Sequence, residues 1–362
     1  MLTAASSRRN RSLVLAMSGA LVVGGCMPSA SVSGRGAIVS SAGATMATTV
    51  ATPYMESQTV SLALDRIDQH SLPLDQTYRH FGTGEGVTIY VFDGGILAGH
   101  PELAGRVRLG YDAFPDEEHL CNAHGTAVAG AAAGATLGVA PAAEVVDVKM
   151  VECHKMRGTI EAIVRSTQWV LADHARHPDR RAIANWSFIA DTAVAVPALD
   201  TAVRQLRAAG IPVVVSAGNL EMDACHISPG NAPGAIVVGA SRVRRARRNT
   251  TSALVDERAP GTAFGPCIDV FAPGDSVLLP SMDGQHAPTQ QLWTGTSMSA
   301  GYVSGAIALY LEAHPFATSG DVSEHVKATA SRAPLMDPRS PMAGILYVGP
   351  ESGMRSLALA RP

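Results

Sequence analysis

The chain has 362 residues, of which 46% are hydrophobic and 16% are charged, and its formal net charge is −3. This length allows one large domain or two smaller ones with a sizeable buried core, and the composition excludes an intrinsically disordered protein. Because the net charge is close to neutral and slightly acidic, we expect no nucleic-acid partner.

The N-terminus has the pattern of an export signal. Arg8, Arg9 and Arg11 precede an apolar run over residues 13–23, which is too short to span a bilayer. The sequence Val-Gly-Gly-Cys follows and places Cys26 where a bacterial lipobox has its lipidated cysteine. We therefore predict a lipoprotein signal peptide over residues 1–25 and an exported protein held at the bacterial envelope through Cys26, its single membrane contact. The alternative is an ordinary cleaved signal peptide.

The rest of the chain is expected to form one folded domain. Residues 26–57 are rich in small polar residues and predict a flexible tether, residues 58–349 the domain, and residues 350–362 a C-terminal tail. Strands are expected over 87–92, 144–151, 182–187, 211–217, 235–240 and 268–272, and helices over 159–174, over 197–209 and in the segments that open at His124 and Ser297. This alternation predicts an α/β fold, with a mainly parallel central sheet and helices on both faces.

Four polar residues lie where this fold would bring them together. Asp93 ends a strand, Asn219 follows another strand, and His124 and Ser297 each lie at the start of a helix. Strand carboxyl ends and helix N-termini share one edge of an open α/β sheet, so we expect these four side chains to converge there.

The chemistry of acyl transfer needs this set of residue types. A serine hydroxyl attacks when an imidazole takes its proton, and a carboxylate orients that imidazole. An amide donor then stabilises the oxyanion, typically by about 3–4 kcal/mol. Taken singly, each residue has an ordinary structural interpretation: Asp93 and Asn219 as turn residues, His124 as a core histidine and Ser297 as a helix N-cap. Their joint occurrence, in the chain order Asp, His, Ser, favours a hydrolase triad.

Four sequence blocks resemble the subtilisin-like serine proteases, in particular the proteinase K and aqualysin branch. They are VFDGG, CNAHGTAVAG, SAGN and GTSMSAGYVSG, and the similarity runs from about Leu62 to Val348. The resemblance implies a subtilisin-like serine endopeptidase that acts on peptides or proteins through an acyl-enzyme, works as a monomer and needs no cofactor for its chemistry. It implies Ser297 as nucleophile, His124 as general base and acid, Asp93 as orienting carboxylate, and Asn219 with the Ser297 amide as oxyanion donors.

The peptide-binding edges depart from the family pattern. The resemblance assigns substrate binding to Ser187, Phe188, Ile189, Ala190 and Gly218, but the family has Ser-Leu-Gly-Gly where this chain has Ser-Phe-Ile-Ala. The opposite edge, usually rich in glycine and serine, has the larger side chains of residues 152–158. These side chains should narrow the cleft and restrict specificity. Two alternatives therefore stay open: a catalytically weak binding or scaffold protein with an obstructed cleft, and an esterase.

Four cysteines besides Cys26 predict two disulfides in an oxidising compartment. They are Cys121, Cys153, Cys225 and Cys267, and their number allows three pairings. A zinc site at Cys121, His124, Cys153 and His154 is less consistent with the sequence, because it has no CxxC pair and leaves Asp93 and Ser297 without a role. The resemblance implies the pairs Cys121–Cys153 and Cys225–Cys267.

The same resemblance implies a structural calcium site. Its ligands would be the backbone carbonyls of Pro233 and Ala235 and the carboxylate of Asp269, and oxygen ligands suit this hard cation. A purely structural role for Asp269 is the alternative.

Overall fold

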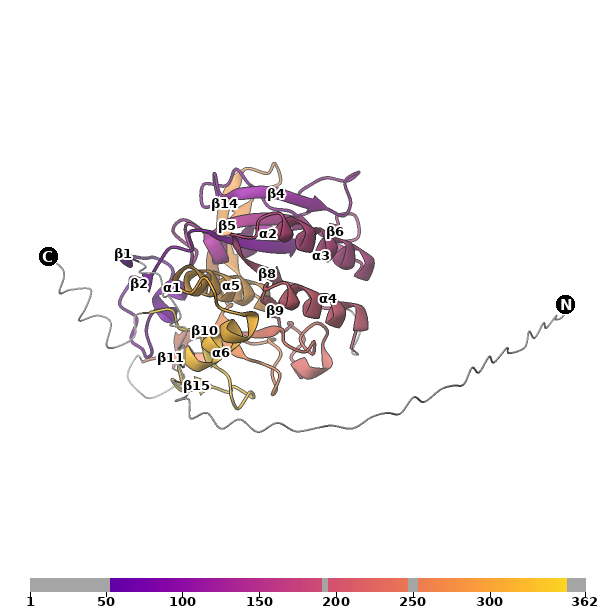
Figure 1. The fold of residues 1–362 in the computed structure, drawn as a ribbon. Coiled ribbons are helices and arrows are strands. Elements are labelled where there is room, and N and C mark those ends of the chain that lie inside the picture. Colours follow the sequence, from indigo (N-terminus) through magenta and orange to yellow (C-terminus); the bar gives the residue numbers. More distant parts are fainter. Residues whose placement is uncertain (1–52, 191–194, 247–252, 350–362) are drawn as a thin grey trace, which may run out of the picture. The chain divides into compact units, whose positions relative to one another are not determined.

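The computed structural model describes residues 53–190, 195–246 and 253–349 (Figure 1). Cys26, the expected signal peptide, most of the expected tether and the C-terminal tail lie outside the described residues. The helices are α1 (Leu62–Ile67), α2 (His124–Ala133), α3 (Ile160–Ala175), α4 (Pro197–Ala208), α5 (Thr296–Ala313) and α6 (Ser319–Thr329), with a 3₁₀ turn at Ala224–His226.

A ten-stranded sheet forms the centre of the fold. Its main path runs β15-β11-β10-β9-β8-β3-β5-β4, with β12 paired to β10 and β16 paired to β12. These strands are β3 (Val87–Asp93), β4 (Val107–Asp112), β5 (Glu144–Lys149), β8 (Arg181–Trp186), β9 (Val213–Ser216), β10 (Ile236–Arg245), β11 (Leu254–Arg258), β12 (Val270–Pro273), β15 (Leu335–Met336) and β16 (Gly344–Ile345). All pairs are parallel except β10 with β11, so the predicted fold class is confirmed.

The central strand β3 supplies side chains to two separate cores. Ile89 and Val91 face the core that includes α2 and α5, whereas Tyr90 and Phe92 face the core that includes α3 and α4. Every residue of β3 is buried, as expected for a parallel strand covered on both faces. This continuous apolar run is why the strand could be predicted from the sequence.

Helices α2 and α5 pack closely because their contacting residues are small. A Cβ atom at Gly301 would lie 2.7 Å from the carbonyl oxygen of Val128, and one at Gly305 would lie 2.4 Å from that of Ala132. Helix α5 is unbroken from Thr296 to Ala313 through Gly301-Tyr302. The two helix starts are therefore held together at the edge of the sheet.

Several elements differ from the sequence expectation. The strand β1 (Tyr54–Gln58) pairs with β2 (Thr77–Phe81), so the C-terminal end of the expected tether is part of the fold rather than flexible. Strand β4 is not among the expected strands; it has no continuous apolar run, and none of its residues is fully buried. Two hairpins were also not expected: β6 (Val151–Glu152) with β7 (Arg157–Gly158), and β13 (Val277–Met282) with β14 (Pro288–Trp293).

Candidate active site

Asp93 and His124 form the best-defined contact at the carboxyl edge of the sheet. The Nδ1 atom of His124 lies 3.0 Å from Oδ1 and 2.8 Å from Oδ2 of Asp93. Asp93 is buried, with 6% of its side chain exposed, while the His124 side chain is 30% exposed. The imidazole is thus anchored by Nδ1, and its opposite side is accessible.

The surroundings of His124 favour its protonated form. Burial lowers the pKa of this imidazole, but the charge of Asp93 and the hydrogen bond to it outweigh burial, so the pKa is raised above its usual value. Trp293, on β14, packs edge-on against the imidazole with the ring centroids 6.2 Å apart. Its Nε1 atom is buried and has no hydrogen-bond partner among the described residues.

Ser297 lies in the first turn of α5 and is held against the end of β8. Its hydroxyl donates to the carbonyl oxygen of Ser187 at 3.2 Å, and the Ser187 hydroxyl donates to the carbonyl oxygen of Ser297 at 3.1 Å. Among the described residues the Ser297 hydroxyl has no hydrogen bond to His124. Rotation about the Ser297 Cα–Cβ bond changes the direction of this hydroxyl, and catalytic hydrogen bonds are often longer or differently aligned when no substrate is bound.

Asn219 is fixed next to Ser297 through its carbonyl group. Its Oδ1 accepts the Thr296 amide at 2.9 Å and the Thr296 hydroxyl at 3.1 Å. Asn219 is exposed, and within the described part of the chain its Nδ2 donates to no protein acceptor. Gly295 has φ +153°, and a Cβ atom there would lie 3.3 Å from Nδ2. The Asn219 side-chain amide is therefore a free donor beside Ser297, whereas in the first turn of α5 the Thr296 amide is bonded to Asn219 and the Met298 amide to the carbonyl oxygen of Gly295 at 3.2 Å.

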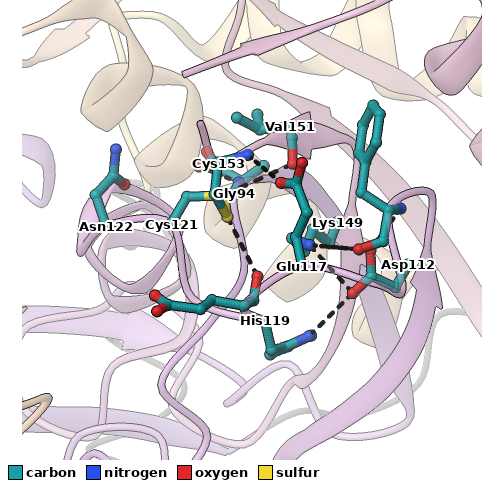
Figure 2. Close-up of a disulfide and its surroundings, with 12 residues drawn as sticks. Gly94, Asp112, Glu117, His119, Cys121, Asn122, Lys149, Val151 and Cys153 are labelled. Carbon is teal, nitrogen blue, oxygen red and sulfur yellow. Dashed lines mark hydrogen bonds and ion pairs between the residues drawn. A yellow bond between two sulfur atoms is a disulfide. The ribbon is translucent and has the colours of Figure 1, made fainter. Parts of the chain in front are cut away.

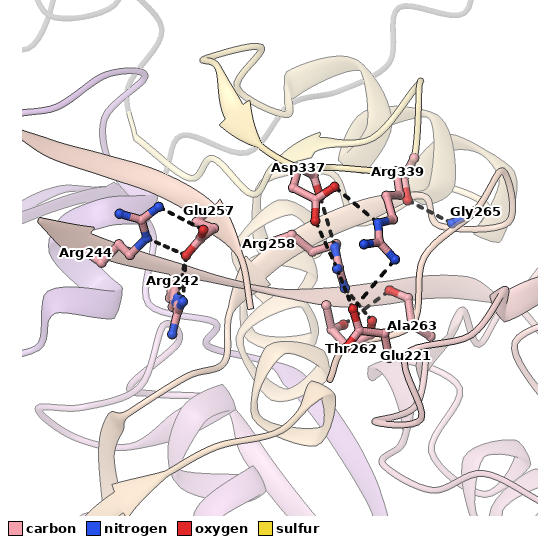
Figure 3. Close-up of polar contacts among 11 residues, drawn as sticks. Glu221, Arg242, Arg244, Glu257, Arg258, Thr262, Ala263, Gly265, Asp337 and Arg339 are labelled. Atoms are coloured by element: carbon pink, nitrogen blue, oxygen red, sulfur yellow. Dashed lines mark hydrogen bonds and ion pairs between the residues drawn. The ribbon is translucent and has the colours of Figure 1, made fainter. Parts of the chain in front are cut away.

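A second polar network holds the loop that carries Asn219 (Figure 3). The buried guanidinium of Arg258 donates to Glu221 at 3.0 Å, to the carbonyl oxygen of Thr262 at 2.8 Å and to Asp337 at 3.3 Å. The Ala263 amide, next to Thr262, donates to the carbonyl oxygen of Gly218 at 2.8 Å. The segment after β9 is thus fixed by hydrogen bonds that do not involve Ser297.

Apolar side chains occupy the expected substrate edge. A Cβ atom at Gly218 would lie 3.2 Å from Cγ2 of Ile189 and 3.5 Å from Cδ1 of Ile227, so both isoleucines cover this glycine. The Phe188 ring stacks on Trp186 with centroids 5.3 Å apart. The Ala190 amide donates to the carbonyl oxygen of Ser228 at 2.8 Å. Of the predicted substrate-binding residues, Ser187 thus contacts Ser297 directly and Ile189 lies over Gly218, while Phe188 and Ala190 contact Trp186 and Ser228.

Both disulfides that the resemblance implies are present. Cys121 pairs with Cys153, and Cys225 pairs with Cys267. The first bridge lies beside the turn that follows Asp93, where the Cys121 amide donates to the Gly94 carbonyl oxygen at 2.9 Å (Figure 2). Because Cys121 and Cys153 are bonded to each other, they cannot act as thiolate ligands of zinc.

The residues proposed for calcium fit a cation poorly. One carboxylate oxygen of Asp269 already accepts the Val237 amide at 2.9 Å. Between Pro233 and Ala235, the carbonyl oxygen of Gly234 accepts a hydrogen bond from the Arg207 guanidinium, which places a positive charge at this loop. A divalent ion there would have the carbonyl oxygens of Pro233 and Ala235 and one carboxylate that is already hydrogen-bonded, with a guanidinium nearby, which is fewer carboxylates than oxygen-rich calcium sites commonly have.

One further acid–base pair near Asp93 escaped the sequence analysis. Nε2 of His119 lies 2.7 Å from Oδ2 of Asp147, whose side chain is 0% exposed. The two residues are 28 positions apart, and nothing in the pattern links them. The available signal was the strand over 144–149 itself, in which Asp147 and Lys149 interrupt the valines that follow Glu144.

The fold and this edge of the sheet together define an α/β protein of the subtilisin-like class. The chain belongs to the subtilase family: the family's sequence profile, Peptidase_S8, matches residues 84–344.

Individual relatives agree with this assignment. The chain is 40% identical over 262 residues to an extracellular serine proteinase of Thermus sp. (strain Rt41A), which covers 72% of this chain and 59% of that protein. It is 35% identical over 286 residues to alkaline serine exoprotease A of Vibrio alginolyticus, covering 78% and 49% respectively. The crystal structure of a cold adapted subtilisin-like serine proteinase matches with a TM-score of 0.69 and 33% identity, over 82% of this chain and 100% of that one. This chain thus spans about half to three fifths of the length of the two named sequence relatives.

Proposed function

We propose that this protein is a serine endopeptidase that hydrolyses peptide bonds through an acyl-enzyme formed on Ser297. The observation that supports this most directly is the buried Asp93 carboxylate on Nδ1 of His124, at the edge where α5 presents Ser297. A carboxylate in this position fixes the imidazole tautomer and stabilises the imidazolium, as serine-hydrolase chemistry requires.

In the proposed reaction His124 acts first as a base and then as an acid, once while the acyl-enzyme forms and once while water hydrolyses it. Ser297 Oγ attacks the carbonyl carbon of the scissile bond while Nε2 of His124 takes the hydroxyl proton, and the carbonyl oxygen becomes an oxyanion. The imidazolium then gives the proton to the leaving amine, the C–N bond breaks and the acyl-enzyme remains. Water repeats the sequence, with His124 as base and then acid, and releases the second product.

The oxyanion would be stabilised by two preorganised donors. These are the Ser297 amide, in the first turn of α5, and Nδ2 of Asn219, whose Oδ1 is already bonded to Thr296. Because Oδ1 of Asn219 is held by Thr296, the N–H groups on Nδ2 need little reorganisation when the oxyanion charge develops.

The substrate edge supports a narrow specificity. Ile189 and Ile227 lie over Gly218, where a glycine would otherwise leave space for a substrate side chain. We propose that Ser187–Ala190 and Gly218 contact the substrate on the acyl side and that small residues are accepted there. Replacing Ile189 with glycine should raise kcat/KM for substrates with a large residue before the scissile bond, and no gain for such substrates would oppose this assignment.

A catalytically weak binding protein is the second candidate. It is favoured by the Ser297 hydroxyl being hydrogen-bonded to Ser187 rather than to His124, and by the apolar cover over Gly218. In that case the family fold would serve to hold a peptide rather than to cut it.

Labelling with a fluorophosphonate probe separates the two candidates. We expect the wild-type protein to be labelled, Ser297→Ala to be unlabelled, and the control Ser323→Ala, in α6, to be labelled like the wild type.

We expect His124→Ala and Ser297→Ala each to abolish peptide turnover, and the double variant to be no worse than either, because triad members act as a unit. A folded wild-type protein that is not labelled would support the binding protein, and losses that add in the double variant would contradict the triad.

Export and lipid attachment at Cys26 complete the proposal. The Thermus relative is named as an extracellular proteinase, which supports export. In the described part of the chain, no helix combines the length and the apolar character needed to cross a bilayer. Incorporation of a labelled fatty acid by the wild type but not by Cys26→Ala would support the anchor, and an unlabelled wild type would remove it.

We propose calcium only as a structural ion whose ligands are not assigned, and we propose that the protein is a monomer. Thermal melts with and without a chelator test the ion, and equal midpoints would remove it. Sedimentation of the purified protein tests the oligomeric state.

A further inference from the structure

Asp147 lies behind the turn that carries Asp93, on the face of the sheet covered by α2. Its Oδ2 atom accepts the Ile96 amide at 2.8 Å and faces Nε2 of His119 at 2.7 Å. Its Oδ1 atom is buried and has no hydrogen-bond partner among the described residues. This carboxylate is therefore held by one neighbouring amide and one imidazole.

The same turn is held from the other side by the helix of His124. The Leu97 amide, next to Ile96, donates to the Thr126 hydroxyl of α2 at 2.9 Å. Gly95 has φ +99°, and a Cβ atom there would lie 2.1 Å from the carbonyl oxygen of His119. The turn from Asp93 to Leu97 is thus enclosed by α2, by Asp147 and by the backbone of His119.

Few cations balance the carboxylates around this turn. Asp93 ends β3, Asp147 lies on β5, and Asp112 ends β4 with its Oδ2 at 3.5 Å from Nδ1 of His119. The fully buried Lys149 is bonded to Asp112 at 3.2 Å. Glu117, on the loop between β4 and α2, is engaged by the Cys153 amide at 2.6 Å. Among these groups, His119 is the one whose charge changes near neutral pH.

We propose that Asp147 and His119 act as a positioning pair for the candidate active site. In this arrangement Asp147 fixes the turn of Asp93 through the Ile96 amide, and the charge of His119 sets how strongly the nearby carboxylates favour protonated His124. The inference rests on the proposed function only in that His124 is the base of the reaction.

The charges determine in which direction His119 shifts the pKa of His124. The hydrogen bond to Asp147 is the main reason why the pKa of His119 is raised, and burial opposes it. Burial raises the pKa of Asp147, and the bond to His119 partly offsets this. While His119 is protonated, it compensates Asp147. When His119 loses its proton or is replaced by a neutral residue, the uncompensated carboxylate favours the imidazolium of His124 and raises its pKa.

The test measures the titration of His124 by NMR in the full-length Ser297→Ala protein, so it needs no turnover. We expect His119→Gln to raise the midpoint by about half a pH unit, and to have no effect when Asp147→Asn is already present. His177→Gln is the matched control, because His177 is similarly exposed and lies beside the buried Asp173 at a distant site. It should leave the midpoint unchanged.

Three results would overturn the proposal: an unchanged midpoint in His119→Gln, an equal shift in the Asp147→Asn background, or an equal shift in His177→Gln. If His119→Gln does not fold, His119→Asn removes the same charge and is titrated in its place, with the same outcomes deciding the proposal. A His124 titration that responds to His119, in a protein that does not cleave peptides, would contradict the proposed function alone. Turnover without coupling would contradict the positioning pair alone.

Discussion

At the scale of single residues, the site depends on how each polar group is held. Asp93 uses both oxygens for His124, and Asn219 uses its carbonyl oxygen for Thr296, which leaves its N–H groups available. The sequence could predict these residues because each follows a strand or starts a helix. It could not predict the contact between Ile189 and Gly218 or the His119–Asp147 pair, because both depend on side-chain directions across different elements.

Asn219 can be tested as a donor with two variants. Asn219→Asp keeps the oxygen that accepts from Thr296 but removes the N–H donor, whereas Asn219→Ala removes both. We expect each to lower kcat by about 10²- to 10³-fold or more, with little change in KM, because the donor acts on the oxyanion. Wild-type kcat in Asn219→Asp would mean that this side chain only supports Thr296. Steady-state kinetics measure the effect, and thermal melts check that both variants fold.

At the scale of elements, the regular alternation of buried strands and helices was predictable, and the edge elements were not. Strands such as β3 and β9 are continuous apolar runs, and that pattern is typical of parallel strands. In contrast, five of the six residues of β14 are exposed, so nothing in its composition distinguishes it from a loop. Its hairpin nevertheless places Trp293 against His124, which shows that a polar segment can carry part of the site.

The packing of α2 against α5 gives a prediction at this scale. Gly305→Ala would place a methyl group 2.4 Å from the Ala132 carbonyl oxygen, so the helices must separate. We expect a loss of about 1–3 kcal/mol in the free energy of unfolding, together with reduced activity, since both helices carry site residues. Gly320→Ala in α6 is the control, because its nearest neighbour would lie at 3.4 Å. Equal stability of the two variants in chemical denaturation would contradict the packing argument.

At the scale of the whole molecule, the two disulfides close loops of 32 and 42 residues in sequence separation. Loop-entropy estimates give about 4 kcal/mol of stabilisation for each, before any native-state strain. Their number was predictable from four cysteines in a chain expected to be exported, whereas the pairing depended on family resemblance.

We therefore expect the double substitution of either bridge by alanine to lower Tm by about 10 °C. Calorimetry of each double variant measures this shift, with Cys26→Ala as the control that should melt like the wild type. A change of less than about 2 °C for both bridges would mean that the unfolded chain gains little freedom when they are removed.

Strand β3, which is shared by the two cores, affects how the protein resists digestion by other copies of itself. Because β3 gives alternate side chains to both layers, we expect the two layers to unfold together. A protein with the proposed peptidase activity is exposed at high concentration to its own copies, which would cleave unfolded chains. Self-digestion should then track global unfolding rather than fraying of one half, and a single calorimetric transition coinciding with loss of intact protein is the expected signature.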